Sequence, residues 1–292
     1  MEKTDMKKFT AIALAAISTI ATISLTSCSK ATKDELEVFK TISLTAEDYA
    51  FAINKENTEL KEDVNEILAD MKADGSLDTL INSYFNGTAT FTYENKTSTP
   101  ADGDFIMATN AYFPPFEYYE GNKFAGVDVE LASIIATELG KTLFVKDMDF
   151  DSIIPSVQNK ECDIGMAGMT VTESRLEQVD FAESYYSSAQ VITVQKGDTT
   201  FDNCKTAADV EAILASKTKD YKVGTQTGTT GYMYSAGDAD FGYDGFTNLT
   251  TKAYQTGALA MTDLSNGLIN AVILDLQPSL MISESINATF KS

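Results

Sequence analysis

From residue 104 onward, short apolar runs alternate with segments whose apolar positions recur at helical spacing. Residues 105–109 form an apolar run of strand length, and residues 127–139 then place Val127, Leu131 and Ile135 on one helical face before Gly140. The alternation continues, with strands predicted at 143–145, 164–169, 189–194, 221–225 and 271–274 and helices at 152–159, 207–215 and 256–266. This pattern predicts an α/β fold of mostly parallel sheets flanked by helices, which bind ligands at the carboxyl ends of their strands.

A second block of regular structure lies upstream, at residues 44–85. Residues 49–53 are strand-like, residues 60–71 carry a helical stripe of apolar side chains, and another short helix is expected after the turn at Asp74 and Gly75. The block contains too little apolar surface to be stable alone, so we expect it to pack on the rest of the chain. Residues 88–103, rich in Thr, Ser and Asn, are typical of a linker.

The first 28 residues have the organisation of an export signal. Lysines near the start precede an apolar run at residues 9–23, which is too short to span a membrane. The run ends in Leu25-Thr26-Ser27-Cys28, which resembles the bacterial lipobox, whose cysteine is lipidated, typically with palmitate. A plain secretory signal that happens to end near a cysteine is the alternative. We therefore predict a signal peptide at residues 1–27 and a lipid anchor on Cys28 that holds the protein on the outer face of the cell membrane.

Composition excludes several classes of function. The 292 residues carry a formal net charge of −21, which argues against nucleic acid as a partner because phosphate binding needs clustered Lys and Arg. The absence of His removes the Ser-His-Asp arrangement and the usual zinc ligands, and we expect no metal and no cofactor. Apart from Cys28, the cysteines are Cys162 and Cys204, and two free thiols are favoured over a disulfide.

Six motifs recur in the order known from one protein family. They are Thr109-Asn110-Ala111-Tyr112-Phe113-Pro114-Pro115-Phe116-Glu117, the run at residues 126–132, the run at residues 150–155, the run at residues 163–175, the run at residues 223–231, and Ala271-Val272-Ile273-Leu274-Asp275. Together they resemble the family 3 extracellular solute-binding proteins, the amino-acid receptors of ABC importers. The resemblance implies a two-lobed, type II periplasmic-binding-protein-like fold. It also implies a monomeric receptor, not an enzyme, that captures a free polar or basic L-amino acid and delivers it to a membrane permease.

Arg175 is the only arginine in the chain. Its planar guanidinium can grip a carboxylate through two parallel hydrogen bonds, which a lysine ammonium cannot do. The alternative, a surface salt bridge, would be served equally well by a lysine. The resemblance makes Arg175 the clamp for the ligand's α-carboxylate, with Thr170 and Thr230 as hydroxyl donors to the same group from the two lobes.

Asp275 ends an apolar strand-like run, which suits a counter-ion for the ligand's α-ammonium group. The alternative is an N-cap for the helix that follows. The resemblance favours the ligand, and it places the backbone of Gly168 against the same amine, where a side chain would obstruct close approach.

The ligand side chain is expected to lie between aromatic rings. Phe113 and Phe150 match the positions that sandwich it, although core packing is the ordinary role of a Phe. Asn110 and Gln226 match variable positions that read the ligand side chain. Many relatives have Asp where this chain has Asn110, which weakens a prediction of a strictly cationic ligand, while cation–π contact still permits a guanidinium.

The order of the segments departs from the family. Ordinary members end with a segment resembling residues 47–55 and the helices after it, whereas this chain carries that segment near its start. We predict a circular permutation, with lobe 1 built from residues 39–87 and 104–192, lobe 2 from residues 193–292, and the new ends in an interlobe crossover, so that one of two hinge strands is severed. The alternative is that the transposed segment packs in a neighbouring molecule.

Two other functions are compatible with the same fold. An exported dehydratase of cyclic acids needs a general acid–base pair in the cleft, and the sequence alone shows none. A ligand-sensing module without transport is the other alternative, and a permease and an ATPase encoded next to this protein would favour transport.

Overall fold

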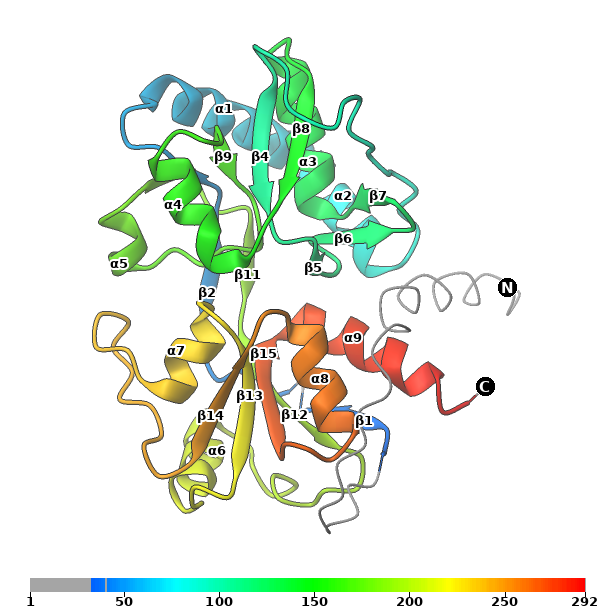
Figure 1. The fold of residues 1–292 in the computed structure, drawn as a ribbon, viewed down its shortest axis with the longest axis vertical. Helices are drawn as coiled ribbons and strands as arrows, with labels where there is room; N and C mark the ends of the chain where they lie inside the picture. The colour runs from blue at the N-terminus through cyan, green and yellow to red at the C-terminus, as the bar shows by residue number, and fades with distance from the viewer. Residues whose placement is uncertain (1–32, 40, 292) are drawn as a thin grey trace.

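The computed structural model of the protein describes residues 33–39 and 41–291. These residues form two α/β lobes stacked along the long axis of the molecule (Figure 1). The predicted signal peptide and Cys28 lie outside the described residues. Within the described part, none of the helices has the length and apolar character needed to cross a membrane.

Lobe 1 is built on a five-stranded sheet of order β10-β3-β9-β4-β8, with a small three-stranded sheet of order β5-β6-β7 beside it. Its strands are β3 (Ala52–Ile53), β4 (Phe105–Thr109), β5 (Tyr112–Phe113), β6 (Glu117–Glu120), β7 (Lys123–Ala125), β8 (Leu143–Asp147), β9 (Ile164–Gly165) and β10 (Asp180–Phe181). Its helices are α1 (Thr58–Asp74), α2 (Ser76–Phe85), α3 (Val127–Glu138), the 3₁₀ turn η2 (Phe150–Ser152), α4 (Ile153–Gln158) and α5 (Glu173–Leu176).

Lobe 2 is built on a second five-stranded sheet, of order β1-β12-β15-β13-β14. Its strands are β1 (Leu36–Val38), β12 (Gln190–Gln195), β13 (Lys222–Gln226), β14 (Thr250–Tyr254) and β15 (Ala271–Asp275). Its helices are α6 (Ala207–Ala215), α7 (Thr230–Ala236), α8 (Gly257–Ser265) and α9 (Leu276–Ala288). The two-lobed α/β fold predicted from the alternation of strands and helices is confirmed.

Each large sheet contains one opposed strand but is mostly parallel, as predicted, because four of its five strands run in the same direction. In lobe 1, β4 is parallel to β8 and β9, while β3 is antiparallel to β9 and β10. In lobe 2, β13 is parallel to β14 and β15, while β12 is antiparallel to β1 and β15. The antiparallel strands β3 and β12 are those that enter a lobe directly from the other one, and they therefore run against the strands of the α/β units.

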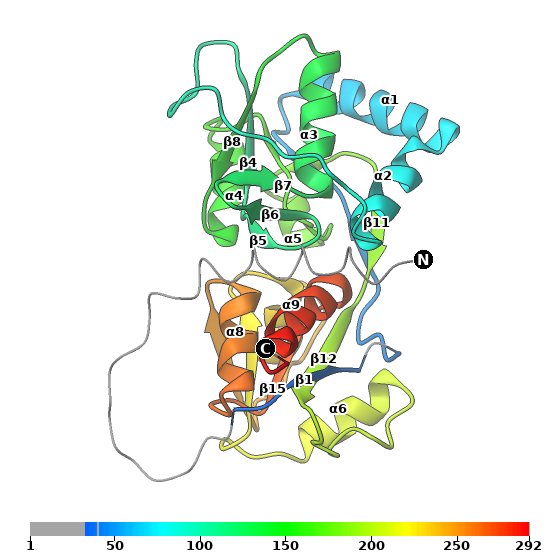
Figure 2. The same ribbon diagram turned by 90° about the vertical axis from the view of Figure 1, so that its right-hand side faces the viewer.

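Two strand segments connect the lobes side by side. β2 (Glu47–Tyr49) and β11 (Tyr186–Ser188) pair antiparallel between the two large sheets (Figure 2). The predicted severed hinge strand is therefore wrong, because both crossovers are continuous. The described residues before β2 belong to lobe 2: the Phe39 N–H donates to the Ile192 carbonyl of β12, and Ile42 and Leu44 lie in the lobe 2 core.

The segment that opens the described chain packs against the last helix. The backbone N–H of Leu36 donates to Asn287 Oδ1 at 2.7 Å, and Asn287 Nδ2 donates to the Leu36 carbonyl at 2.9 Å. Nearby, the Lys33 ammonium lies 5.3 Å from the ring centre of Phe290. The predicted location of the ends in a crossover is thus corrected: β1 and the end of α9 meet within lobe 2.

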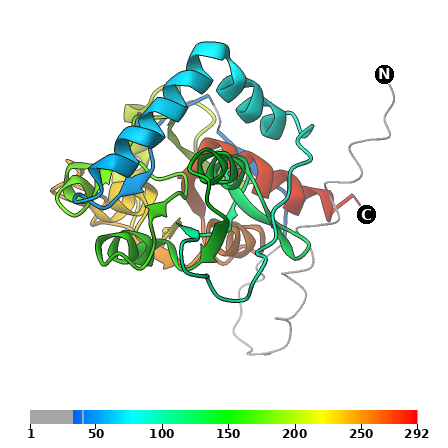
Figure 3. The same ribbon diagram turned by 90° about the horizontal axis from the view of Figure 1, so that it is seen from above.

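Helices α1 and α2 pack on lobe 1, along one side of the molecule (Figure 3). Val64, Leu68 and Leu77 are buried in the same cluster as Met107 of β4 and Ile135 of α3. Gly75, with a φ of 78°, separates the two helices in the left-handed conformation that glycine adopts at least cost. The expected docking of this block onto the rest of the chain is confirmed.

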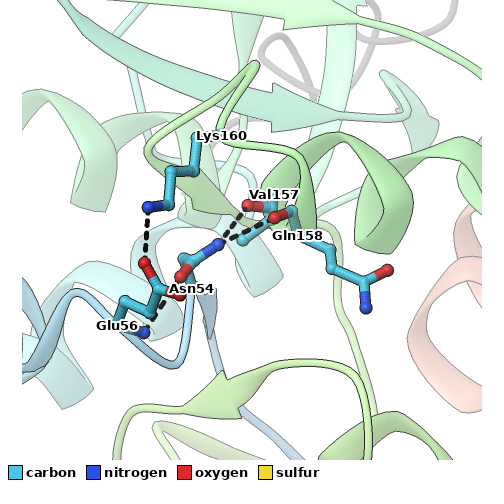
Figure 4. Close-up of polar contacts among 5 residues, drawn as sticks. All are labelled: Asn54, Glu56, Val157, Gln158 and Lys160. Carbon is cyan, nitrogen blue, oxygen red and sulfur yellow. Dashed lines mark hydrogen bonds and ion pairs between the residues drawn. The ribbon is translucent and has the colours of Figure 1, made fainter.

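Polar contacts also hold this block against α4. Asn54 Nδ2 donates to the carbonyls of Val157 and Gln158 at 3.1 and 2.9 Å, and so satisfies the end of α4 (Figure 4). Lys160, in the left-handed region with a φ of 60°, reaches back to Glu56 at 2.6 Å. Both of these surface side chains are exposed, so the ion pair contributes little to stability.

Candidate functional site

All nine residues predicted to bind the ligand line one pocket between the lobes. Lobe 1 supplies Asn110, Phe113, Phe150, Gly168, Thr170 and Arg175, and lobe 2 supplies Gln226, Thr230 and Asp275. The enclosed space is about 10 Å³, close to the minimum that holds one water molecule. An amino acid therefore needs the two walls to move apart before it can enter. That these side chains bind a ligand stays a prediction.

The Arg175 guanidinium lies between the two lobes. Arg175 is only 5% exposed, which rules out the alternative of a surface salt bridge. Nη1 donates to the Thr170 carbonyl at 2.6 Å and Nη2 to the Gly228 carbonyl of lobe 2 at 3.0 Å, while Phe150 lies 5.4 Å away. Burial lowers the pKa of Arg175 to about 10, against the opposing effect of two nearby carboxylates, so the group is charged at neutral pH.

The hydroxyls of Thr170 and Thr230 converge on a carboxylate that the sequence did not point to. Glu47 Oε2 accepts from Thr170 Oγ1 at 2.8 Å and from Thr230 Oγ1 at 2.9 Å, and Gln190 Nε2 lies at 3.4 Å. Its other oxygen accepts from Thr45 at 2.7 Å. Glu47 is buried on β2, so a hinge strand places a carboxylate directly behind the pocket-lining residues Thr170 and Thr230.

Asp275 stands at the carboxyl end of β15, where the sequence placed it. It occupies the N-cap position of α9, but its side chain makes no capping hydrogen bond, and it accepts instead from the hydroxyl of Tyr49. Helix capping, the alternative role for Asp275, therefore does not explain where its side chain points. Burial, together with the negative charge of Glu47, raises the pKa of Asp275 to about 7.

A second pair of acids lies deeper in lobe 1. Asp128 accepts from the Gly168 N–H at 2.9 Å and from the Tyr185 hydroxyl at 2.6 Å, and burial raises its pKa to about 6. Glu117 lines the pocket, and among the described residues the one candidate partner for its two oxygens is the carboxyl of Asp128. Burial and the adjacent Asp128 raise the pKa of Glu117 well above its usual range.

Neutral side chains complete the contact between the lobes. Gln226 Nε2, at the end of β13, donates across the pocket to Asn110 Oδ1 at 3.0 Å, and Asn110 Nδ2 donates to the Met148 carbonyl at 2.8 Å. The two residues predicted to read a ligand side chain therefore bond each other in this arrangement.

Both the backbone conformation of Gly168 and the side chains packed around it require a residue without a Cβ. Its φ is 52°, and an added Cβ would lie 2.7 Å from the Phe113 ring and 3.2 Å from that of Tyr49. Strand β9 ends at Gly165 and the backbone bends at residues 167 and 168, so the strand predicted over residues 164–169 is shorter in the structure.

Three residues of the site were missed in the sequence. Glu117 is the last residue of the motif that contains Phe113 and Pro115, and this position could have identified it as a site residue. Glu47 and Tyr49 lie in the block at residues 44–85, and only the packing of β2 brings them into contact with residues that line the pocket. The described residues contain no group of three or more His, Cys, Asp or Glu side chains arranged to hold a metal ion. Cys162 and Cys204 are free thiols.

Comparison with known proteins gives consistent matches. Residues 105–273 match the bacterial extracellular solute-binding proteins, family 3. The arginine-binding extracellular protein ArtP of Bacillus subtilis is 41% identical over 102 residues, which cover 35% of this chain and 40% of ArtP. The putative ABC transporter arginine-binding protein 2 of Escherichia coli is 33% identical over 170 residues, 58% of this chain and 62% of that protein. The chain thus spans about two fifths to three fifths of the length of these relatives.

Among solved structures, an ancestral arginine-binding protein bound to glutamine is similar. It has a TM-score of 0.51 and 34% sequence identity, and the match covers 63% of this chain and 75% of that protein.

The buried acids predict a stability that falls as pH rises from 5 to 8. The folded-state pKa values of Asp275 and Asp128 lie above their unfolded values, so the folded protein binds more protons and is destabilised when they leave. Asp275→Asn should remove on the order of 2 kcal/mol of this pH dependence. Thermal unfolding midpoints between pH 5 and pH 8 measure the effect.

The control for that measurement is Asp70→Asn, which removes the same charge from an exposed position on α1. It should keep the pH dependence of the unaltered protein. A midpoint that rises with pH, or an Asp275→Asn profile parallel to the Asp70→Asn profile, contradicts the prediction.

Proposed function

The chain belongs to the bacterial extracellular solute-binding proteins, family 3, and from this premise we propose that it captures a basic L-amino acid between its two lobes. The observation that carries the proposal is the convergence of Arg175, Thr170, Thr230 and Asp275 on one pocket. A guanidinium and hydroxyl donors beside a carboxylate match the two charged ends of an α-amino acid. The residue types recognise the backbone common to all amino acids, so the rest of the pocket must select the side chain.

The guanidinium of Arg175 is fixed before any ligand arrives. Two of its five N–H groups are held by the Thr170 and Gly228 carbonyls, which orient the planar group and leave the others for a carboxylate. Asp275 lies within electrostatic reach of the same guanidinium. A zwitterion placed with its carboxylate on Arg175 and its ammonium on Asp275 complements both charges.

Buried charge supports a cationic ligand. Among the ionisable side chains buried in the described part of the chain, Glu47, Asp128 and Asp275 accompany a single base, Arg175, while the raised pKa of Glu117 favours its neutral form. A ligand with a net positive charge offsets this excess, whereas a neutral or acidic one does not. The relatives named as arginine-binding proteins support the same choice. The proposed ligand is therefore L-arginine or a similar basic amino acid, with its side chain between Phe113 and Phe150.

We expect Arg175→Lys to weaken binding of L-arginine about tenfold or more, because lysine keeps the charge but loses the two-pronged contact. Isothermal titration calorimetry measures the change. In the unaltered protein, agmatine, which is arginine without its α-carboxylate, should fail to raise the thermal midpoint that L-arginine raises.

A screen of free amino acids by thermal shift gives the decisive comparison. The proposal fails if no amino acid raises the midpoint, or if agmatine binds as well as L-arginine. Stabilisation by glutamate or aspartate but not by arginine or lysine would show that the buried acids do not select the ligand.

Glu117 supports a second candidate, an exported dehydratase of cyclic acids. A buried carboxyl with a raised pKa that lines the pocket is suited to general acid catalysis. We favour binding, because Glu117 faces Asp128 and the relatives are named as binding proteins. Recovery of the bound amino acid unchanged after prolonged incubation distinguishes a receptor from an enzyme. A ligand-sensing role on the same fold keeps this pocket and differs only in the membrane partner.

The proposed receptor delivers its ligand to an ABC permease from the outer face of the membrane, where Cys28 carries a lipid. The lipobox-like sequence before Cys28 supports the anchor. In a bacterial host fed an alkyne fatty acid, the unaltered protein and a Cys204→Ser control should take up the label, and Cys28→Ser should not. Label that persists in Cys28→Ser contradicts a lipid on this cysteine.

We also propose that the chain is a circularly permuted, monomeric member of its family. The family match begins at residue 105, whereas the segment from β2 to α2 lies before it and packs on lobe 1. Leu36 bonds Asn287, and Lys33 lies against Phe290, so a short connection would restore the ordinary order of segments. Permutation is tolerated when the joined ends are close.

A reordered chain, with residues 105–291 followed by a short Gly-Ser link and residues 33–87, tests the permutation. It should sediment as a monomer and bind L-arginine within about threefold of the original, because it can make the same contacts. Failure to fold, or an original chain that binds only as a dimer, would favour exchange of the segment between two molecules.

A further inference from the structure

We propose that Glu47 is an internal carboxylate that competes with the ligand's α-carboxylate for Thr170 and Thr230 and thereby sets the affinity of the site. The inference rests on the proposed function and concerns the same pocket. Glu47 is 4% exposed, and its Oε2 atom accepts from Thr170 of lobe 1 and Thr230 of lobe 2. One hinge carboxylate thus occupies the hydroxyl donors of both lobes.

The competition follows from the number of protons. A threonine hydroxyl has a single proton to donate, so it cannot serve two carboxylates at once. The lengths of 2.8 and 2.9 Å show that both protons are directed to Glu47. A ligand carboxylate that takes these hydroxyls must displace Glu47 from them, and it also approaches a like charge in a buried site.

Both carboxylate oxygens of Glu47 have hydrogen-bond donors nearby. Thr45 precedes it on the same hinge segment and donates to its other oxygen, and Gln190 of β12 points its amide nitrogen at Oε2. The charged groups near it are Arg175 and Asp275, whose pKa values both respond to its charge. Glu47 therefore shares Arg175 with any incoming carboxylate, in addition to the two hydroxyls.

Glu47 lies on a hinge strand, so its competition with the ligand is coupled to how closely the two lobes approach. β2 is one of the two strands that connect the lobes, and its partner β11 leads directly into β12 and Gln190. The bonds from Glu47 to both lobes favour the close approach of Thr170 and Thr230. A ligand that breaks them replaces a bridge made by the chain with a bridge made by its own carboxylate.

The test is Glu47→Gln in the full chain, with L-arginine as the probe in isothermal titration calorimetry. The amide keeps the size of the side chain and removes its charge, and its Nε2 can donate to a threonine oxygen, which frees that hydroxyl's proton for the ligand. We expect binding about tenfold tighter. Asp48→Asn is the matched control, because it removes the same charge from the next residue of β2, whose exposed carboxylate bonds Ser187. It should bind within about twofold of the unaltered protein.

A double-mutant cycle identifies the route of the effect. If Glu47 acts through the hydroxyls, the gain from Glu47→Gln should shrink at least threefold in a Thr230→Val background. Affinity that is unchanged or weaker in Glu47→Gln, with Asp48→Asn normal, overturns the inference and leaves the proposed function standing. Binding by neither the unaltered protein nor Glu47→Gln overturns the proposed function, and this inference with it. If Glu47→Gln does not fold, Glu47→Ala provides the same comparison.

Discussion

The arrangement of this molecule depends on one buried guanidinium. Arg175 is the single basic side chain buried in the described residues, and it lies within electrostatic reach of Glu47 and Asp275. Each of these charges would be costly to bury alone, and each reduces the cost of the others. Since the guanidinium also bonds carbonyls of both lobes, the same group balances the buried charge and fixes how closely the lobes approach.

The polar groups of the pocket are largely satisfied by one another. Gln226 donates to Asn110 across the pocket, Tyr49 donates to Asp275, and the threonine hydroxyls donate to Glu47. These contacts leave an enclosed space of only about 10 Å³. In the proposed receptor, closure of the lobes and capture of a ligand therefore draw on the same donors and acceptors. Affinity in such a site is a difference between two sets of hydrogen bonds, and small changes in either set alter it.

Order along the chain matters less to this fold than contact in space. The buried side chains of α1 and α2 pack against those of β4 and α3, which follow them in the sequence, and all four elements share one hydrophobic cluster. β1 pairs with β12. Leu36 of β1 also forms a hydrogen bond with Asn287 of α9, which lies 251 positions later in the sequence. Hydrophobic burial is non-directional and depends on the area removed from water, so the core forms whichever segment is made first. To connect the two lobes, the crossover strands β2 and β11 need only pair with each other.

The sequence by itself determined the local elements and much of the pocket. Periodicity located β4, α3, α6 and β15 because each has a clear apolar pattern and a clear end, such as Gly140 after α3. All nine residues predicted from the motifs line one pocket, because they stand at strand ends such as Gln226 and Asp275, or in the turns and short helices that follow strands.

Only the tertiary structure decided that β3 and β12 run against the other strands of their sheets, that both crossovers are continuous, and that Glu47 and Tyr49 contact the site. Strand direction depends on how a segment enters its lobe, which no local pattern records. Glu47 becomes a site residue because residues 123 and 183 positions away donate to it, and a single buried carboxylate in a short strand has no periodicity that would reveal such partners.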